Sequence, residues 1–206
     1  MQNAMNHLIE TMRQKGVLRT PRIAEAFAAV DRRFFVPPGF EAQMYEDHPL
    51  PIGEGQTISQ PSTVAFMLEL LQPEAGDRIL DIGSGSGWTT ALLGYLAGEK
   101  GSVEGLERQP ALVETGRRNL APLGLPNVCI DPAGAVLGRP GETYDKILVS
   151  ASAPQLPVQL FDQLRPGGVL VIPVEHTIYR FEKQDDGTIR REAYPGFVFV
   201  PLVYTA

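Results

Sequence analysis

A run of alternating glycines is the strongest chemical signal in the sequence. It follows a predicted buried strand at 78–82, precedes a predicted helix, and reads Gly83-Ser84-Gly85-Ser86-Gly87. Glycine lets the chain turn sharply and lets a ligand approach the backbone without meeting a Cβ atom. A strand, a glycine turn and a helix in this order place a ligand at the carboxyl end of the strand. We therefore expect these five residues to contact a bound cofactor.

The spacing of these glycines selects among nucleotide ligands. A dinucleotide fingerprint, G-x-G-x-x-G, needs glycine or alanine at position 88, where Trp88 stands. The sequence also lacks the G-x-x-x-x-G-K-[ST] pattern of triphosphate-binding loops. Alternating glycines preceded by an acidic residue, here Asp81, instead suit the amino-acid and ribose part of S-adenosylmethionine, which carries no phosphate.

Glu107 is the second candidate cofactor ligand. It ends a predicted strand at 102–107, 20 residues after Gly87, and an acidic residue at this separation accepts hydrogen bonds from ribose hydroxyls in nucleotide-binding folds. The alternatives are a glycine turn without a ligand and a solvated carboxylate at a strand end. Because two elements stand at the right separation, the sequence favours a nucleoside cofactor.

The elements that must position these residues alternate between strands and helices. Short β-branched runs predict strands, and apolar residues at helical spacing predict helices. The predicted strands are 78–82, 102–107, 127–130, 146–149 and 169–174, and the predicted helices are 61–71, 88–97, 110–120 and 158–164. Strands separated by helices form βαβ units, so we predict an α/β fold with a doubly wound, mostly parallel sheet.

Both ends of the chain depart from this pattern. Two amphipathic N-terminal helices, the second beginning near Thr20 and Pro21, are predicted to cover the core. Residues 34–60 hold too many prolines and glycines for a regular element, so we predict a long functional loop. The C-terminal edge is predicted to be antiparallel, with a hairpin of 179–183 and 188–192 and a further strand at 197–200.

We predict one domain over 1–206. Its regions are a helical lead-in and loop at 1–60, a βαβ core at 61–175 and antiparallel strands at 176–206.

Composition limits the partners and the compartment. The chain has 18 basic and 24 acidic residues and a net charge of −6, which disfavours a nucleic-acid partner. The single cysteine, Cys129, is predicted to be a buried strand residue, and the three histidines lack metal-ligand spacing, so we expect no metal. We find no signal-peptide h-region and no apolar run long enough for a membrane span. We expect a cytoplasmic monomer without a membrane partner.

Several short segments between Val30 and Leu202 together resemble one known family. They are Arg33–Pro37, Pro49–Gly53, Gly55–Pro61, Asp81–Trp88, Tyr144–Ile147, Ala151–Pro154, Gln163–Gly168 and Phe199–Leu202. The chain resembles the protein-L-isoaspartate (D-aspartate) O-methyltransferases, which are class I S-adenosylmethionine-dependent methyltransferases with a Rossmann-like fold. The segment Gly-x-Gly-Gln-Thr-Ile-Ser at 53–59 is the most specific part of the resemblance, because other methyltransferases of this class lack it.

The resemblance implies a protein-repair activity. Members transfer methyl from S-adenosylmethionine to the α-carboxylate of an L-isoaspartyl residue, and the ester then closes to a succinimide whose opening restores some normal aspartate. Substrates would be isoaspartyl-containing peptides and proteins. By the same resemblance, Ser59 would present its hydroxyl to the acceptor carboxylate. Thr57, Ile58, Asp81, the 83–87 loop, Glu107 and Gly134 would contact the cofactor, and Val200, Pro201 and Leu202 would lie along the substrate peptide.

Such a reaction needs few catalytic groups. The acceptor carboxylate is already ionised at pH 7 and requires no general base, so alignment and exclusion of water carry the rate. A serine hydroxyl can orient a carboxylate by one hydrogen bond, which makes Ser59 a positioning residue. The alternative is that Ser59 caps the helix that begins at Pro61.

The chain also departs from the family pattern. Relatives carry Gly-Asp-Gly beside the adenine, where this chain has Ala133-Gly134-Ala135, and Asp131 is the nearest alternative acceptor. Three hypotheses follow: an active isoaspartyl methyltransferase with weakened adenine recognition, a methyltransferase for another carboxylate or small acceptor, and a non-catalytic paralogue that binds damaged or unfolded segments.

Overall fold

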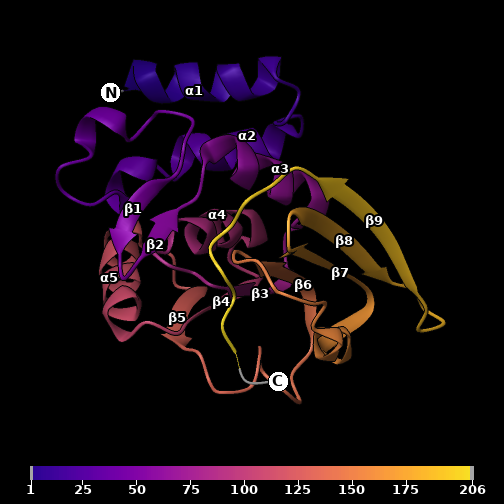
Figure 1. The fold of residues 1–206 in the computed structure, drawn as a ribbon. Helices are drawn as coiled ribbons and strands as arrows, with labels where there is room; N and C mark the ends of the chain where they lie inside the picture. Colours follow the sequence, from indigo (N-terminus) through magenta and orange to yellow (C-terminus); the bar gives the residue numbers. More distant parts are fainter. Residues whose placement is uncertain (1, 205–206) are drawn as a thin grey trace.

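A central sheet organises the computed structural model, which describes residues 2–204. Its seven strands stand in the order β5-β4-β3-β6-β7-β8-β9. The parallel part contains β3 (Arg78–Ile82), β4 (Ser102–Glu107), β5 (Val128–Pro132), β6 (Tyr144–Val149) and β7 (Leu164–Val174). The antiparallel edge contains β8 (Thr177–Lys183) and β9 (Ile189–Pro195). The predicted α/β class, the mostly parallel sheet and the antiparallel C-terminal edge are confirmed (Figure 1).

Five α-helices contribute to the larger of two apolar cores of the described chain. They are α1 (Gln2–Gln14), α2 (Pro21–Ala29), α3 (Pro61–Leu71), α4 (Trp88–Ala97) and α5 (Pro110–Leu120). Successive side chains of a strand point to opposite faces, and Ile79 and Leu80 of β3 accordingly belong to the two different cores. Figure 1 shows α1 as the outermost helix and α2 beside α3, between α1 and α4, so the two N-terminal helices cover the core as predicted.

The second core is covered by short segments. Between β6 and β7 the sequence predicts a crossover helix at 158–164, and the structure has a short 3-10 helix, η4 (Val158–Gln163), whose Leu160 is fully buried. Pro157 precedes this element and Pro166 follows it closely, which leaves little room for regular α-helical turns. β7 starts at Leu164, before the predicted strand.

The prediction that 34–60 lacks regular elements is wrong. This segment contains the 3-10 helices η1 (Arg32–Phe35, starting just before it) and η2 (Glu41–Gln43), and a hairpin of β1 (Leu50–Gly53) and β2 (Gln56–Ile58). Pro51 is tolerated because a two-stranded ladder leaves one edge of each strand free of hydrogen bonds. Gly53, Glu54 and Gly55 all have positive φ in the turn. The prolines and glycines near this turn are therefore compatible with a tight hairpin.

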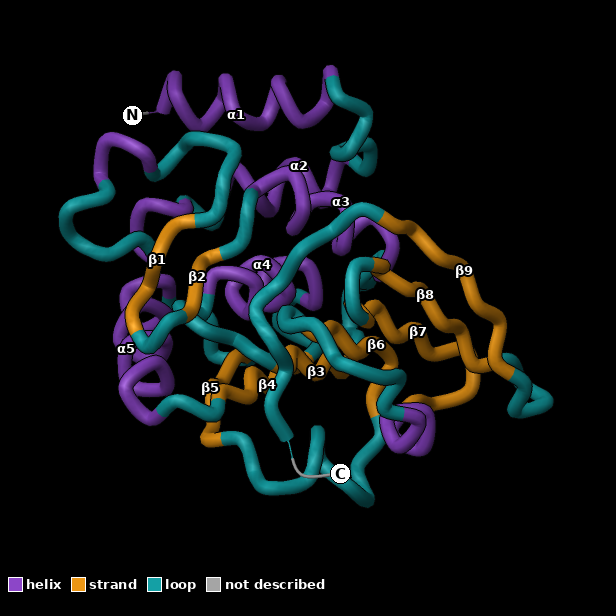
Figure 2. The backbone as a smooth tube through the Cα atoms, in the orientation of Figure 1, coloured by secondary structure: helices purple, strands orange, loops and turns teal. Residues whose placement is uncertain are grey.

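The predicted strand at 197–200 is also wrong. After β9 the chain continues as an irregular tail, 196–204, that passes in front of β3 and β4 in the view of Figure 2. Its β-type contact is an isolated bridge between Pro201 and Ser152. The Ser152 N–H donates to the Val200 carbonyl, and the Leu202 N–H donates to the Ser152 carbonyl, both at 2.8 Å. Residues 197–200, whose types favour strands, therefore lie at the carboxyl ends of the strands and do not join the sheet.

Candidate active site

The glycine loop forms the base of the site between β3 and α4. Gly83, Gly85 and Gly87 have φ values of 84°, 52° and 88°, a region that side chains rarely adopt. Gly87 is the N-cap residue of α4, and a Cβ there would lie 3.1 Å from Ile130 Cδ1 and 3.3 Å from the carbonyl of Gly116 on α5. The glycines therefore allow the turn itself and the close packing of α5 beneath it.

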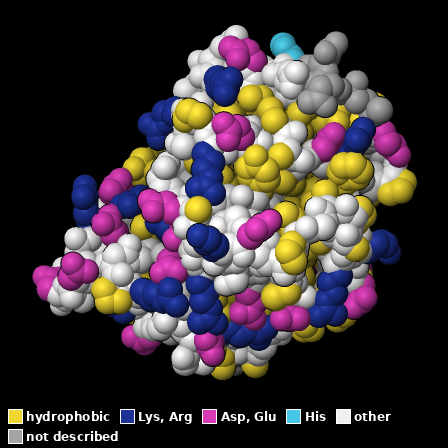
Figure 3. Space-filling view, turned by 180° about the vertical axis from the view of Figure 1, so that it is seen from behind, with side chains coloured by type: hydrophobic (Ala, Val, Ile, Leu, Met, Phe, Trp, Pro, Cys, Tyr) yellow, Lys and Arg dark blue, Asp and Glu magenta, His cyan; other side chains and the backbone are white. Residues whose placement is uncertain are grey.

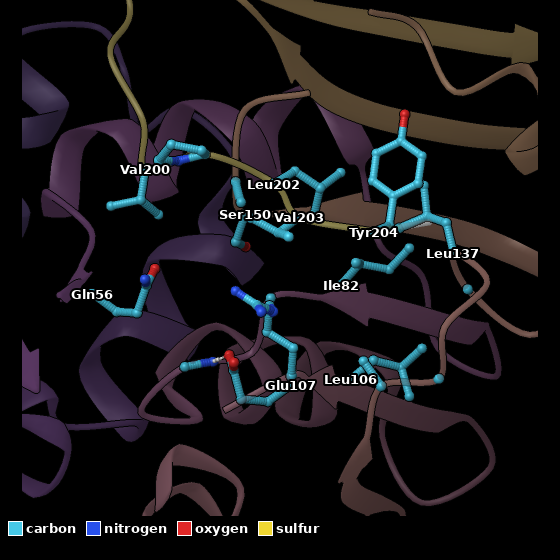
Figure 4. A pocket seen from close by; sticks show the side chains of 18 of the residues that line it. Gln56, Ile82, Leu106, Glu107, Leu137, Ser150, Val200, Leu202, Val203 and Tyr204 are labelled. Atoms are coloured by element: carbon cyan, nitrogen blue, oxygen red, sulfur yellow. Dashed lines mark hydrogen bonds between the residues drawn. The ribbon is translucent and has the colours of Figure 1, made fainter. Parts of the chain in front are cut away.

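Glu107 ties this loop to the end of β4. Its carboxylate accepts hydrogen bonds from the Gly85 N–H at 3.0 Å and from the Gln109 N–H at 2.9 Å, one on each oxygen. The side chain is buried, yet it lines the cavity in front of the loop (Figure 4). A carboxylate oxygen has two lone pairs, so each oxygen retains capacity for a further donor such as a ribose hydroxyl.

The main cavity extends from the glycine loop along the carboxyl ends of β3, β4 and β6. Its base contains Gly83, Gly85, Glu107 and Gly134, and its roof contains Thr57 of the hairpin and the tail residues Val200, Pro201 and Leu202. All eight are among the site residues that the sequence predicted. Figure 4 shows Gln56 and Glu107 on one side of the space and the tail on another.

Two further spaces share lining residues with the main cavity. The loop pocket is lined by Thr57, Ile58, Ser59, Gly83, Ser84, Gly85, Ser86, Trp88, Thr89 and Ser150. The tail groove is lined by Pro49, Thr57, Ser59, Gln60, Thr63, Ser150, Val198, Phe199 and Val200. Within residues 2–204, Thr57 and Ser150 line all three spaces, and Ser59 lines the loop pocket and the tail groove.

Ser59 does not cap α3, so that alternative interpretation is wrong. The N-cap residue is Gln60, and it makes no side-chain capping bond. Asp47 serves the helix start instead, because its carboxylate accepts from the Ser62 N–H at 2.9 Å and from the Ser62 hydroxyl at 2.6 Å. Ser59 instead lines the loop pocket and the tail groove.

Arg32 holds the backbone of Ser59 from behind. Its guanidinium is fully buried and donates to the carbonyls of Met44, Glu46, His48 and Ser59 at 2.9–3.2 Å. It also lies 5.3 Å from the ring centroid of Trp88, at the start of α4. Burial lowers the pKa of Arg32 to about 10, and the Asp47 carboxylate partly opposes that decrease. One buried cation thus connects the hairpin, the preceding loop and the glycine-loop helix.

Asp81 and Gly87 line none of the three spaces and act beneath the loop. The Asp81 carboxylate is fully buried and accepts from the Thr90 hydroxyl at 2.6 Å and from the Ser150 hydroxyl at 3.4 Å. Burial raises the pKa of Asp81 to about 6, and the nearby Glu107 adds to the increase. Asp81 therefore supports the site through other side chains.

Several lining residues were missed by the sequence interpretation. They include Ile52, Gln56, Leu106, Arg108, Leu137, Ser150, Val203 and Tyr204. Ser150 had a usable signal, because it directly follows β6 as Gly83 follows β3, and parallel strands end at the same edge of a sheet. The hairpin and tail residues had none, since their approach depends on tertiary packing.

Some local interpretations are corrected by the structure. Cys129, predicted to be buried, is exposed on the edge strand β5. Asp131 does not replace the missing adenine acceptor, because Arg117 binds its carboxylate at 2.9 Å and it lies outside the main cavity. Trp88 is buried at the helix start, as predicted.

The cavity residues fit a nucleoside cofactor that carries an amino acid. The Ser84 hydroxyl is buried without a hydrogen-bond partner among the described residues, and it belongs to the loop that would hold the ligand. Glu107 offers free lone pairs, and Ile82, Leu106 and Leu137 give the cavity an apolar wall. In the described part of the chain, no group of three or more His, Cys, Asp or Glu side chains is arranged to hold a metal ion. Nor does any helix of residues 2–204 have the length and apolarity to span a membrane.

Comparison with known proteins agrees with this geometry. Residues 2–206 match the family model described as protein-L-isoaspartate(D-aspartate) O-methyltransferase. A protein-L-isoaspartate O-methyltransferase of Anaeromyxobacter dehalogenans is 45% identical, with 96% of each chain covered. One of Methanopyrus kandleri is 42% identical, with 97% of this chain and 91% of the relative covered.

Solved structures agree with the sequence relatives. A Plasmodium falciparum beta-aspartate methyltransferase (PCMT), solved with S-adenosyl-L-homocysteine, superposes with a TM-score of 0.84 at 27% identity, covering 96% of this chain and 97% of that one. A further protein-L-isoaspartate O-methyltransferase gives a TM-score of 0.86 at 28% identity, covering 97% of this chain and 66% of that one. The chain therefore belongs to the protein-L-isoaspartate(D-aspartate) O-methyltransferase family.

Proposed function

We propose that this chain transfers a methyl group from S-adenosylmethionine to the α-carboxylate of L-isoaspartyl residues in damaged proteins. One observation carries the proposal. The main cavity, with Glu107 and the glycine loop, shares Thr57, Ser150 and Val200 with a groove that Ser59 and the exposed Val198 also line. A nucleoside donor and a peptide acceptor can thus approach one point from two sides.

The residues of the donor side have distinct roles in this proposal. Glu107 accepts the ribose hydroxyls, and the 83–87 loop surrounds the amino-acid part of the donor, with Ser84 supplying an unpaired hydroxyl. Ile82, Leu106, Gly134 and Leu137 contact the base. The donor supplies an electrophilic methyl group on a positively charged sulfur. Thr57 and Ile58 of the hairpin cover this side and exclude water.

On the acceptor side, Ser59 orients the carboxylate. Its hydroxyl donates one hydrogen bond and leaves the carboxylate's other lone pairs free to attack. No Lys or Arg is among the residues that line the tail groove. The acceptor carboxylate would therefore form no ion pair there that engages its attacking lone pairs. Catalysis consists of alignment, which can contribute about 7–11 kcal/mol in well-oriented systems.

We also propose that the enzyme acts as a monomer on exposed isoaspartyl segments in the cytoplasm. The net charge is −6, and basic and acidic side chains are interspersed on the face seen in Figure 3, which supports protein rather than nucleic-acid substrates. A single cysteine is typical of a reducing compartment.

A paired-peptide assay tests the proposal. Two peptides of identical sequence, one with L-isoaspartate and one with normal aspartate, are incubated with the enzyme and radiolabelled donor. We expect label in the isoaspartyl peptide alone, lost on alkaline hydrolysis of the ester. Equal labelling of both peptides would indicate a carboxyl methyltransferase of another specificity. Binding of S-adenosylhomocysteine in calorimetry without labelling of either peptide would likewise indicate a methyltransferase for another acceptor, whereas no binding at millimolar cofactor would indicate a non-catalytic paralogue.

A further inference from the structure

Three spaces meet at one pair of side chains. Thr57 of the hairpin and Ser150 at the end of β6 line the main cavity, the loop pocket and the tail groove. Under the proposed function, the donor lies in the main cavity with Glu107 and the acceptor enters by the tail groove with Ser59. The methyl group must then cross between Thr57 and Ser150.

The backbone and side chain of Ser150 are both fixed by the sheet. Its N–H donates to the Ile82 carbonyl at 2.8 Å, which continues the β3–β6 pairing. Its hydroxyl lies 3.4 Å from one oxygen of the fully buried Asp81, whose other oxygen binds Thr90. Figure 4 shows the side chain between Ile82 and the tail residues Val200 and Leu202.

This arrangement gives the hydroxyl a direction. A serine has one proton and two lone pairs, and an ionised Asp81 can only accept. Burial raises the pKa of Asp81 to about 6, so it is ionised above that pH, and Glu107 is the charged group that faces it from β4. With its proton directed to Asp81, Ser150 presents its oxygen lone pairs to the junction.

We propose that Ser150 is a second hydroxyl of the methyl-transfer site, whose lone pairs contact the electron-poor methyl group while Ser59 orients the acceptor. In the step, a carboxylate oxygen forms a bond to the methyl carbon. The carbon–sulfur bond breaks and its electron pair stays on sulfur, so an ester and a neutral thioether result. The fixed oxygen dipole stabilises the positive charge on the methyl group in transit.

Replacing Ser150 by alanine tests this inference, which rests on the proposed function. At pH ~8 and saturating substrates, we expect Ser150→Ala to lower kcat about fivefold. The Kd for S-adenosylhomocysteine and the KM for the isoaspartyl peptide should stay within about twofold. Ser150→Thr keeps the hydroxyl and should retain at least about half of the wild-type kcat.

Ser152→Ala is the matched control. Its hydroxyl binds the Glu175 carbonyl, its side chain lines none of the three spaces, and alanine keeps the backbone bonds to the tail. We expect wild-type kcat for this variant. The inference is overturned by Ser150→Ala with wild-type kcat, by equal losses in Ser150→Ala and Ser152→Ala, or by a loss confined to donor affinity. A wild-type enzyme that labels no isoaspartyl peptide would reject the proposed function instead.

Discussion

The donor side and the acceptor side of the site are built by different means. The donor side consists of the 83–87 loop and Glu107, which lie within one stretch of the βαβ core and are joined by a direct hydrogen bond. The acceptor side consists of Ser59, which directly follows the hairpin, and the 198–200 tail segment, and these are more than a hundred residues apart in the sequence. Arg32 holds one of these segments, and backbone bonds from Ser152 hold the other.

This difference separates two functions of the fold. The donor is an invariant small molecule, and a loop fixed by sheet hydrogen bonds can be preorganised for it. The acceptor is a peptide of variable sequence, so a surface assembled from a hairpin and a tail suits it better. We therefore expect substitutions on the donor side to change cofactor affinity and substitutions on the acceptor side to change turnover or peptide affinity.

The largest expected effect is on the donor side, for Gly85→Val. Its φ of 52° strains any β-branched residue, and a Cβ would lie 3.1 Å from Ile52 Cδ1 at the cavity wall. We expect affinity for S-adenosylhomocysteine to fall by more than about 100-fold in calorimetry. Gly124→Val is the control, because Gly124 has a φ of 60° with open space around its Cβ position and lies outside the main cavity. Equal affinities for Gly85→Val and wild type would refute the loop assignment.

Ser59→Ala should have the next largest effect, on the acceptor side. We expect kcat to fall about 10-fold to 100-fold, with cofactor affinity and thermal stability unchanged. Ser62→Ala should do the reverse. Its hydroxyl binds Asp47 at the start of α3, so its loss should lower the free energy of unfolding by about 1 kcal/mol while kcat is kept. Steady-state kinetics measures kcat of both variants, and calorimetry measures their cofactor affinity and thermal stability. An unchanged kcat in Ser59→Ala would reject the positioning role of Ser59.

The tail, 196–204, contains residues of both sides, so it tests the division between donor side and acceptor side within one segment. Leu202 lines the main cavity but not the tail groove, whereas Val198 lines the groove and is 84% exposed. Leu202→Ala should weaken S-adenosylhomocysteine binding about threefold to tenfold and leave the peptide KM unchanged. Val198→Ala should raise the peptide KM by a similar factor without changing cofactor affinity. If Leu202→Ala instead raised only the peptide KM, Leu202 would be a substrate contact, as the family resemblance implies.

The smallest expected effect concerns the buried carboxylate beneath the donor side. The pKa of Asp81 is about 6 in the folded protein and 3.8 ordinarily. The folded state therefore binds the proton of the Asp81 carboxyl more tightly than the unfolded state does. This tighter binding stabilises the fold fully below pH 3.8, and the stabilisation is lost as the pH rises through about 6. The amide of the Asp81→Asn variant does not titrate. The Tm of wild type minus that of Asp81→Asn should decrease by a few degrees between about pH 4 and pH 7, and a difference independent of pH would contradict the buried ionisation.

Much of the fold was predictable because its signals are local. Alternation of β-branched strands with helices predicts the parallel sheet, and positions such as Pro61 and Pro110 mark helix starts that the structure reproduces. The failures occur where local signals conflict. Pro51 and the glycines of 53–55 suggested an irregular loop but form a hairpin. The run of valine and phenylalanine at 197–200 suggested a strand, but backbone bonds between Ser152 and the tail hold this segment at the strand ends instead.

The amino-acid sequence by itself determined the donor side: the Gly83–Gly87 turn and Glu107 are specified by residues whose partners lie on adjacent elements, so spacing along the chain translates directly into spacing in the fold. Only the tertiary structure decided the acceptor side and the meeting point at Thr57 and Ser150. These positions depend on how a hairpin, a strand end and a tail pack together. Contacts between segments so distant in the chain produce no periodic pattern of residue types from which they could be predicted.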